Sequence, residues 1–181
     1  MAAESEKALF LDRDGIINVD HGYVSEIKAF EFTEGIFALL HSFRDAGYRF
    51  FVVTNQSGIG RGYYSEADFQ ILTEWMTARF RERGIEIERV LYCPHAPEAD
   101  CHCRKPDTGM IEEALEVSPL DLQRSWLIGD KSSDIELAEN AGIGHSIYIG
   151  KKISPSATLS FESVDECARY FQENEGKIED L

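Results

Sequence analysis

Two aspartates stand two residues apart, directly after a short apolar segment near the start of the chain. Residues 8–11 read ALFL, and Asp12 and Asp14 follow within FLDRDG. In an extended chain, side chains at positions i and i+2 point to the same side, so both carboxylates can face one pocket. Two close carboxylates repel each other unless a cation lies between them, and Mg²⁺ prefers a few carboxylates together with water and phosphate oxygens. The pair therefore indicates a magnesium site, with a polar turn as the alternative.

Other polar residues that suit a phosphate group also follow apolar segments. Thr54 and Asn55 come after RFFVV and can donate hydrogen bonds to phosphate oxygens. Lys105, in CRKPD, offers a compact positive charge for the same oxygens. Asp130 ends SWLIGD, and together with Asp134 it can complete an acidic metal site. Each residue alone fits a turn or an exposed surface, but the group together, in this order and with Asp12, Thr54 and Asp130 at the ends of expected strands, favours phosphate chemistry.

A second group of metal-binding residue types lies in the segment YCPHAPEADCHC. It offers three sulfurs and one imidazole, from Cys93, His95, Cys101 and Cys103. Four such ligands match a closed tetrahedral zinc site, which has no open position for water or substrate and is therefore structural. The alternatives are a loop with unligated thiols, or His102 as a competing ligand between two cysteines. We expect zinc to fix the loop 93–103 and so to direct Arg104 and Lys105, which follow it, into the site.

Short apolar segments alternate with helical patterns along the chain. We expect strands at 8–11, 49–54, 89–93, 125–129 and 146–150, because their continuous apolar character suits parallel strands that are covered on both faces. We expect helices at 33–47, 65–84, 109–117, 133–142 and 163–176, the first capped by Thr33 and stopped by Gly47 and the second starting at Ser65 and ending at Gly84. The prediction is a Rossmann-like, doubly wound α/β fold with a mainly parallel sheet and helices on both faces. Ligands of such sheets bind at the carboxyl ends of the strands.

Length and composition limit the classes of protein. The chain has 181 residues, which predicts one domain, residues 1–181. A formal net charge of -15 argues against nucleic-acid and anionic-membrane partners, because both need clustered Lys and Arg. We find no signal peptide and no apolar run of membrane-spanning length, so we expect a cytoplasmic protein with reduced cysteines. Nothing in the sequence indicates an oligomer, and a monomer is the default expectation.

The order of these motifs resembles the haloacid dehalogenase superfamily of phosphatases. The matching segments are DRDG, the strand-end Thr54, the lysine of CRKPD and GDKSSD. The resemblance implies that Asp12 attacks phosphorus to form an aspartyl-phosphate, and that Asp14 protonates the leaving alcohol and then activates water. It implies that Thr54 and Lys105 hold the phosphoryl oxygens. It also implies that Mg²⁺ is bound by Asp12, the backbone carbonyl of Asp14, and Asp130.

Longer segments are similar to the zinc-containing branch of this superfamily, which includes histidinol-phosphate and heptose-bisphosphate phosphatases. They are FLDRDGIINVDHGYV, VVTNQSGIGRGYYSE, LTEWM, YCPH, CRKP and GDK. The resemblance implies removal of the 7-phosphate of D-glycero-D-manno-heptose 1,7-bisphosphate, in the synthesis of nucleotide-activated heptose for lipopolysaccharide or S-layer glycan. It implies substrate contacts from Arg13, Asp20, His21, Gly22, Tyr23, Thr54, Asn55, Gln56, Ser57, Arg104, Lys105 and Lys131. No inserted cap domain is expected, because the connections between motifs have room for little more than one helix each.

Several alternatives stay open at this point. Histidinol phosphate is the rival substrate, and a capless phosphatase can also act on protein or nucleic-acid ends. A zinc-bearing binding module without activity is the non-enzyme alternative. The short APEAD segment between His95 and Cys101 leaves the preferred anomer undetermined. We expect GIGRG to be a flexible turn, and we assign no role to His41, His145 and Cys167.

Overall fold

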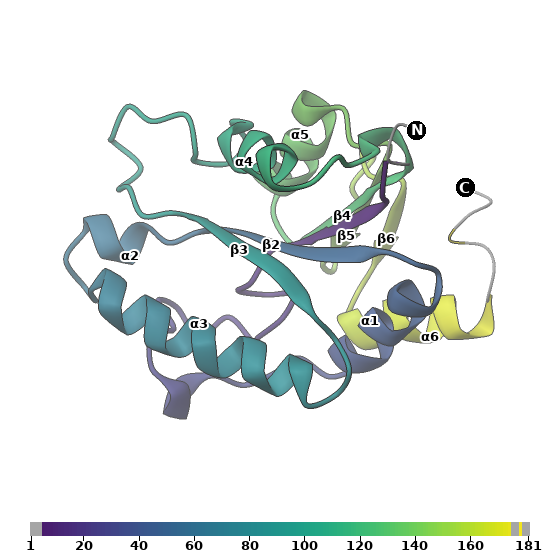
Figure 1. Ribbon diagram of the computed structural model, residues 1–181, viewed down its shortest axis with the longest axis horizontal. Coiled ribbons are helices and arrows are strands. Elements are labelled where there is room, and N and C mark those ends of the chain that lie inside the picture. Colours follow the sequence, from purple (N-terminus) through teal and green to yellow (C-terminus); the bar gives the residue numbers. More distant parts are fainter. Residues whose placement is uncertain (1–4, 175–177, 179–181) are drawn as a thin grey trace.

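Six parallel strands form the centre of the molecule, in the order β3-β2-β1-β4-β5-β6 (Figure 1). The strands are β1 Ala8–Leu11, β2 Arg49–Asn55, β3 Ile87–Cys93, β4 Trp126–Gly129, β5 His145–Ile149 and β6 Leu159–Phe161. The computed structural model describes residues 5–174 and 178. Parallel neighbours need a crossover connection, usually a helix. The chain places β2 and β3 on one side of β1, and then β4, β5 and β6 on its other side. The carboxyl ends of β1, β2 and β4 therefore lie side by side.

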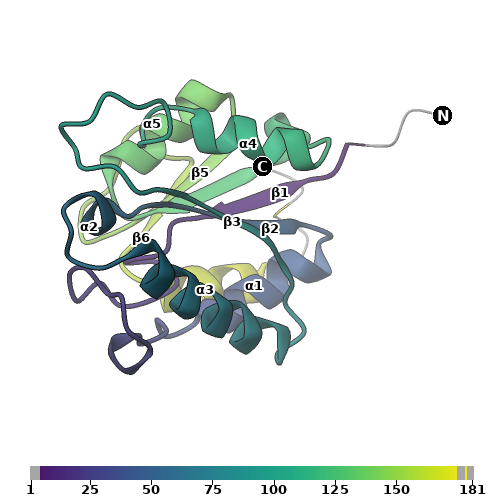
Figure 2. The same ribbon diagram turned by 60° about the vertical axis from the view of Figure 1, so that its left-hand side comes forward.

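Helices cover both faces of the sheet, as the sequence predicted. They are α1 Ile36–Asp45, α2 Ser57–Gly60, α3 Glu66–Arg81, α4 Gly109–Val117, α5 Ser132–Ala141 and α6 Val164–Glu173, with 3₁₀ turns η1 Ile27–Ala29 and η2 Leu122–Arg124. The helices α1, α3 and α6 lie on one side of the sheet, whereas α4 and α5 lie on the other (Figures 1 and 2). The result is a three-layer α/β architecture with a mainly parallel, here entirely parallel, sheet.

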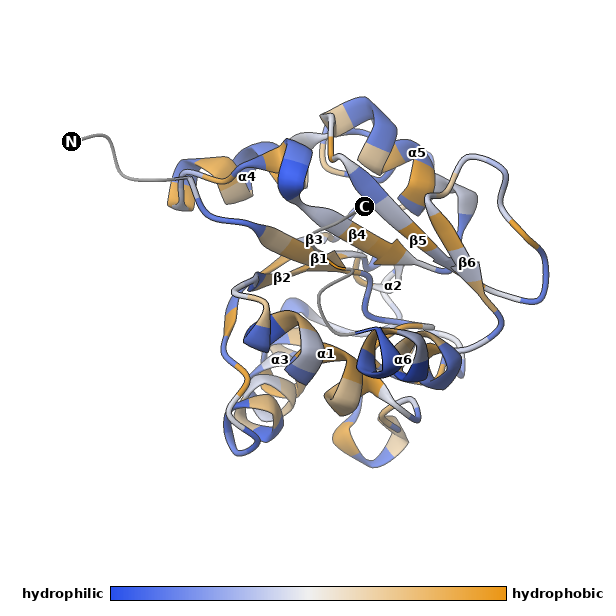
Figure 3. Cartoon of the chain, turned by 90° about the vertical axis from the view of Figure 1, so that its right-hand side faces the viewer, coloured by the Kyte–Doolittle hydropathy of each residue, from blue (hydrophilic) through white to orange (hydrophobic). Residues whose placement is uncertain are grey.

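Successive side chains of the central strands point alternately to the two faces of the sheet, and so contribute to a hydrophobic core on each face. Along β1, Leu9 and Leu11 pack toward α1, α3 and α6, whereas Ala8 and Phe10 pack toward α4 and α5. All four residues of β1 are fully buried, which is why the strand reads as a continuous apolar run. Figure 3 shows the same order, with hydrophobic strands between helices whose outer faces are hydrophilic. Burial on both faces fixes the register of the strand, and therefore the direction of the side chains that follow it.

The predicted start of α3 is confirmed, and the predicted cap of α1 is wrong. The Ser65 hydroxyl accepts a hydrogen bond from the backbone N–H of Asp68, and the Asp68 carboxylate accepts one from the Ser65 N–H, which forms a capping box. In contrast, α1 begins after Gly35, which has a φ of 84°. A Cβ on Gly35 would lie 2.6 Å from the Cα of Asp165, so close packing against α6 requires a glycine there. Thr33 instead donates its hydroxyl to the carbonyl of Ile16 at 2.5 Å.

The sequence did not predict two short elements. The strand β6 has only three residues, all half-buried, so it lacks the apolar run that marks the central strands. The helix α2 covers Ser57–Gly60, within the region where a flexible turn was expected. The predicted last helix ends at Glu173 in the structure, and its residues 175–176 lie outside the described residues.

The connections that follow the strands are loops of modest length. The chain from Asp12 to Gly35 contains only η1 and isolated bridges, and the β2–β3 connection contains α2 and α3. Neither connection holds an inserted folding unit, so the carboxyl ends of the strands stay uncapped, as predicted. Within the described part of the chain, no helix is both long and apolar enough to cross a membrane.

Candidate active site

Three buried charged side chains meet where β1, β4 and the segment before α4 converge. The Lys105 Nζ lies 3.0 Å from Asp12 Oδ1 and 2.6 Å from Asp134 Oδ1. The exposed fractions of Asp12, Lys105 and Asp134 are 4%, 5% and 0%. The same Nζ also donates to the backbone carbonyl of Val53 at 3.0 Å. We call Asp12, Lys105 and Asp134 the acid–lysine cluster.

Burial and charge act against each other in this cluster. Burial raises the pKa of the Asp12 carboxyl well above its usual range, Lys105 lowers it, and Asp134 raises it further. Burial acts to lower the pKa of Lys105, but the carboxylates of Asp12 and Asp134 together raise it above its ordinary value. Lys105 is therefore a permanent cation, and it partly neutralises two buried acids. A further cation would relieve the charge that remains.

Asp130 brings a third carboxylate to the site. Oxygen atoms of Asp12, Asp130 and Asp134 lie within 4.8 Å of one another. Lys131 pairs with Asp130 at 3.2 Å, so two ammonium groups face three carboxylates. A Cβ on Gly15, which has a φ of 94°, would lie 2.2 Å from Asp130 Oδ2, so the glycine of DRDG lets the β1 loop approach this acid. Carboxylate oxygens with surplus negative charge are the donor set that suits a hard cation such as Mg²⁺.

Asp14 faces the same cavity as Asp12, but its carboxylate is held apart from the acidic group. Its Oδ1 accepts hydrogen bonds from Arg13 Nη2 and Asn18 Nδ2, both at 3.0 Å. Its Oδ2 accepts one from Gln56 Nε2 at 3.0 Å. Three donors therefore fix the orientation of the Asp14 carboxylate beside the cavity.

Asn55, at the end of β2, contacts the backbone of Lys105, whereas the acids of the cluster contact its side chain. The Asn55 Oδ1 accepts the backbone N–H of Lys105 at 3.0 Å. Thr54 is buried, and its hydroxyl oxygen accepts a hydrogen bond from Gln56 Nε2 at 2.9 Å. The Thr54 hydroxyl proton thus stays available to another acceptor. Asn55, expected from the sequence as a phosphate donor, also positions Lys105.

A cavity of about 420 Å³ opens above these groups, within the size range of ligand sites. Most of the residues predicted to touch substrate line it, namely Asp12, Asp14, Asp20, Gly22, Tyr23, Asn55, Gln56, Ser57, Arg104, Lys105 and Lys131. Three predicted residues do not, namely Arg13, His21 and Thr54, of which Thr54 is buried and accepts its hydrogen bond from Gln56. Arg13 is buried and directs Nη2 to Asp14 and to the Val24 carbonyl, whereas His21 pairs with Glu31 at 3.0 Å near the surface.

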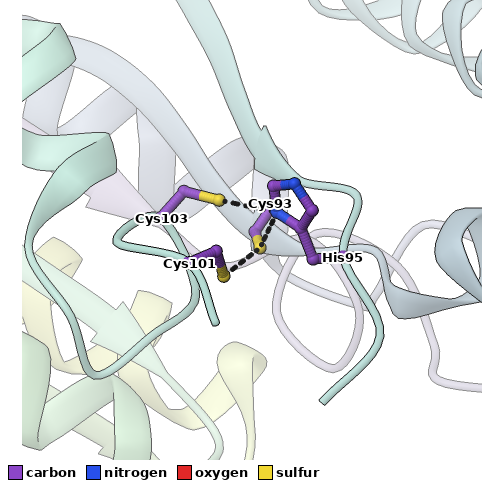
Figure 4. A group of neighbouring side chains, drawn as sticks. All are labelled: Cys93, His95, Cys101 and Cys103. Carbon is purple, nitrogen blue, oxygen red and sulfur yellow. Dashed lines mark hydrogen bonds between the residues drawn. The ribbon is translucent and has the colours of Figure 1, made fainter. Parts of the chain in front are cut away.

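The Cys/His cluster forms beyond β3, and we keep this name for Cys93, His95, Cys101 and Cys103 (Figure 4). Its four ligand atoms all lie within 4.8 Å of one another, and the Cys93 and Cys101 sulfurs are 3.7 Å apart. Tetrahedral zinc with Zn–S bonds of about 2.3 Å places its ligands roughly 3.8 Å apart, which this spacing matches. His102 lies outside the cluster, because its Nε2 is 3.0 Å from Glu112. Within the described residues, the ligand set predicted from the sequence is the one that gathers.

Sequence reasoning missed two residues of the site, Tyr64 and Asn18, and identified only one task of a third, Asp134. Asp134 was considered only as a metal ligand, yet it anchors Lys105 and accepts the backbone N–H of Lys131 at 3.1 Å. Its place in the first turn of α5 was a usable signal, because acids there often bind backbone N–H groups. Tyr64 contacts Gln56, and Asn18 contacts Asp14, only when the loops are folded, so no local sequence pattern predicts these contacts.

Relatives of known name cover most of the chain. It is 43% identical, over 86% of its length, to the D-glycero-beta-D-manno-heptose-1,7-bisphosphate 7-phosphatase of Salmonella typhi, 87% of which is covered. It is 45% identical, over 76% of its length, to the D-glycero-alpha-D-manno-heptose-1,7-bisphosphate 7-phosphatase of Photorhabdus laumondii, 79% of which is covered. The named relatives thus include enzymes for both anomers.

The fold is likewise that of a solved relative. The D,D-heptose 1,7-bisphosphate phosphatase of B. bronchiseptica, determined with magnesium and phosphate, superposes with a TM-score of 0.81. The match covers 93% of this chain and 99% of that one at 24% identity, which supports the shared fold. Residues 102–162 match the family model described as HAD-hydrolase-like. The chain belongs to the haloacid dehalogenase family of hydrolases and, within it, to the group of the heptose-bisphosphate phosphatases.

Proposed function

We propose that this chain removes the 7-phosphate of D-glycero-D-manno-heptose 1,7-bisphosphate through an aspartyl-phosphate intermediate. The observation that carries the proposal is the meeting of Asp12 and Asp14, from the loop after β1, with Lys105, from the segment before α4, at one cavity. A buried carboxylate beside a fixed ammonium group is a feasible nucleophile for phosphorus. Phosphoryl transfer otherwise depends mainly on positioning and on neutralised charge, and the acid–lysine cluster supplies both.

The two carboxylates have distinct tasks in this scheme. An oxygen of Asp12 forms a bond to phosphorus while the bond between phosphorus and the sugar oxygen breaks. Asp14 gives its proton to the departing sugar oxygen. Asp14 then takes a proton from water, the water oxygen bonds to phosphorus, and the bond to Asp12 breaks to release inorganic phosphate. Lys105 and the free hydroxyl proton of Thr54 hold the phosphoryl oxygens throughout.

A magnesium ion fits the acidic group beside the nucleophile. Asp12 and Asp130 would hold it with carboxylate oxygens, and Asp14 would hold it with the backbone carbonyl, since its carboxylate is engaged by three donors. When bound, the ion neutralises charge on the phosphoryl group and on the nearby carboxylates. The pairing of Asp134 with Lys105 leaves that carboxylate as an anchor for the lysine.

Arg104 is suited to recognise the second phosphate of the substrate. It lines the cavity next to Lys105, and in the described part of the chain its buried Nη1 atom has no hydrogen-bond partner. A guanidinium group binds phosphate through two parallel hydrogen bonds. We expect Arg104→Gln to raise KM for the bisphosphate far more than for heptose 7-phosphate, which lacks the second phosphate.

We also propose that the Cys/His cluster binds structural zinc and thereby directs Arg104 and Lys105. Arg104 and Lys105 directly follow Cys103 in the chain, so a fixed position of Cys103 also restricts the positions of these two residues. All four positions of the ion would be filled by the chain, so the metal has no site for substrate. The proposed unit is one phosphatase domain, residues 1–181, that carries the zinc loop 93–103 within it.

The test of the proposed function is Mg²⁺-dependent phosphate release from a panel of substrates. The panel contains both anomers of heptose 1,7-bisphosphate, histidinol phosphate and fructose 1,6-bisphosphate. We expect the highest kcat/KM for one heptose anomer. Preference for histidinol phosphate would contradict the substrate assignment and leave the chemistry, whereas no release from any member would contradict the enzyme itself.

A further inference from the structure

Tyr64 reaches into the site through a chain of hydrogen bonds. Its hydroxyl donates to Gln56 Oε1 at 2.5 Å. Gln56 then donates Nε2–H to Asp14 Oδ2 at 3.0 Å and to Thr54 Oγ1 at 2.9 Å. Gln56 is 2% exposed, so its amide exchanges these partners for water only at a cost. One phenol therefore orients an amide that contacts both Asp14 and Thr54.

The contacts of Asp14 assign different tasks to its two oxygens. Oδ1 accepts two hydrogen bonds, from Arg13 and Asn18, which use both of its lone pairs. Oδ2 accepts one, from Gln56, so one lone pair remains for a proton. A general acid–base carboxyl must hold its proton on the oxygen that faces the reacting groups. Gln56 contacts that oxygen directly.

We propose that Tyr64, acting through Gln56, is a positioning residue that aims Oδ2 of Asp14 at the leaving oxygen. This inference rests on the proposed phosphatase function and goes beyond it by adding Tyr64, which lines the cavity and whose hydroxyl contacts Gln56. The amide of glutamine has two ends of similar size, so its orientation depends on its partners. A donor at Oε1 fixes that end, and both N–H groups then point at Asp14 and Thr54.

The chain is built so that Tyr64 can come this close. A Cβ on Gly58 would lie 2.2 Å from Cε1 of Tyr64, so only glycine leaves room for the ring. Burial raises the pKa of Tyr64 to about 12, Arg13 lowers it, and Asp14 raises it. The phenol therefore keeps its proton and remains a donor to Gln56 over the working range of pH.

The test compares kcat/KM of the wild type and of Tyr64→Phe on phenyl phosphate and p-nitrophenyl phosphate. The two substrates have nearly the same shape, but p-nitrophenolate leaves with little help from an acid, whereas phenolate needs a proton. General acid–base catalysis is typically worth ~10²–10⁴-fold, and a misplaced acid loses part of it. We expect Tyr64→Phe to lower kcat/KM about 10-fold on phenyl phosphate and less than about 2-fold on p-nitrophenyl phosphate.

The matched control is Tyr63→Phe, since Tyr63 is exposed and its ring, not its hydroxyl, contacts Tyr23. We expect this variant to match the wild type on both substrates. Gln56→Met is the second test, because it keeps the approximate shape of the side chain and removes both the carbonyl oxygen and the NH₂ of its amide. It should reproduce the selective loss on phenyl phosphate, and a loss common to both substrates should accompany it through Thr54.

Two outcomes would overturn the inference while leaving the proposed function in place. One is an unchanged kcat/KM in both Tyr64→Phe and Gln56→Met, and the other is an equal loss on both substrates, which would mean a contact with substrate or a general change of structure. A wild type that releases no phosphate from any member of the substrate panel above would instead overturn the proposed function, and the inference with it. Failure of the function and failure of the inference are thus read from different substrates.

Discussion

The acid–lysine cluster and the Cys/His cluster each bring several ionisable side chains close together, but the two differ in how their charge is balanced. The first is buried and contains its own cation, because Lys105 lies between Asp12 and Asp134. The second lies mostly at the surface, with only Cys93 buried, and none of its four members carries a permanent positive charge. The first cluster therefore contains part of its own compensating charge, whereas the proposed zinc ion would supply the compensating charge of the second.

The core holds the acid–lysine cluster in place, whereas the loop of the Cys/His cluster is held mainly at its flanks. Asp12 and Asp134 stand next to strand ends inside the core, where register and packing define their positions. The loop of the Cys/His cluster is held at its flanks, where Gly60 donates its N–H to the Pro94 carbonyl and Gly109 donates to the His102 carbonyl. We infer that the core sets the catalytic geometry and that zinc transmits this order to Arg104 and Lys105.

The substitution with the largest expected effect is Asp12→Asn, which tests the self-contained cluster. Asparagine keeps the shape of the side chain but removes the nucleophilic carboxylate, so turnover should be lost. Asp134 remains as a partner for Lys105, so zinc content and Tm should stay near those of the wild type. Residual turnover comparable to the wild type would contradict the covalent mechanism.

The next largest effect is expected from Asp134→Ala, which removes the anchor of Lys105. Two donors, the Lys105 Nζ and the Lys131 N–H, would lose their buried acceptor, at a cost of about 1–3 kcal/mol in the free energy of unfolding. A displaced Lys105 should lower kcat about 10²-fold. Urea unfolding and steady-state kinetics measure the two effects.

The matched variant for this position is Asp134→Asn. It keeps an oxygen that can accept from Lys105, so its losses in stability and in kcat should both be smaller. Equal effects of the two substitutions would mean that the charge of Asp134, rather than its hydrogen bonds, anchors the lysine.

The sequence predicted the parts of the molecule that follow from local pattern. Continuous apolar runs located the central strands, and the residues after them, Asp12, Thr54 and Asp130, came together because parallel strands end at one edge. The alternation that placed Asp12 and Asp14 on one side also places Arg13 on the other. Arg13 is accordingly buried behind Asp14, so a stricter use of the same rule would have kept its side chain out of the cavity.

The remaining features depend on contacts between distant segments. Gly35 replaces Thr33 at the start of α1 because α6 packs against it, and no local signal contains that contact. Tyr64 finds Gln56 because Gly58 leaves room for its ring. Such contacts appear only when the loops are folded, whereas the ligand set of the Cys/His cluster was readable because residue type alone restricts it.

A smaller effect is expected from Cys101→Ser, which tests the cluster that depends on metal. The variant should lose zinc, and a loop that moves by about 1 Å would cost roughly 10–10²-fold in kcat/KM by misplacing Arg104 and Lys105. The core would stay folded, because the loop lies outside it. His102→Ala is the control, since His102 pairs with Glu112 and should keep both zinc and activity. Full activity of Cys101→Ser without zinc would show that the core alone positions Lys105.

The smallest single effect is expected from Asn55→Ala, which joins the two regions of the comparison. Asn55 Oδ1 accepts the backbone N–H of Lys105, so it ties the end of β2 to the segment just after the Cys/His cluster. With zinc bound, this tie is one of several restraints on Lys105, and its loss should cost about one neutral hydrogen bond, a few-fold in kcat.

Without zinc, the same tie becomes the main restraint on the backbone of Lys105. The double variant Asn55→Ala with Cys101→Ser should therefore lose more activity than the product of the two single losses. Residues that share a network depart from additivity in this way, and a kinetic double-mutant cycle measures the departure. Strict additivity would mean that β2 and the zinc loop act on Lys105 independently, and the inferred transmission of order from the metal to the lysine would be wrong.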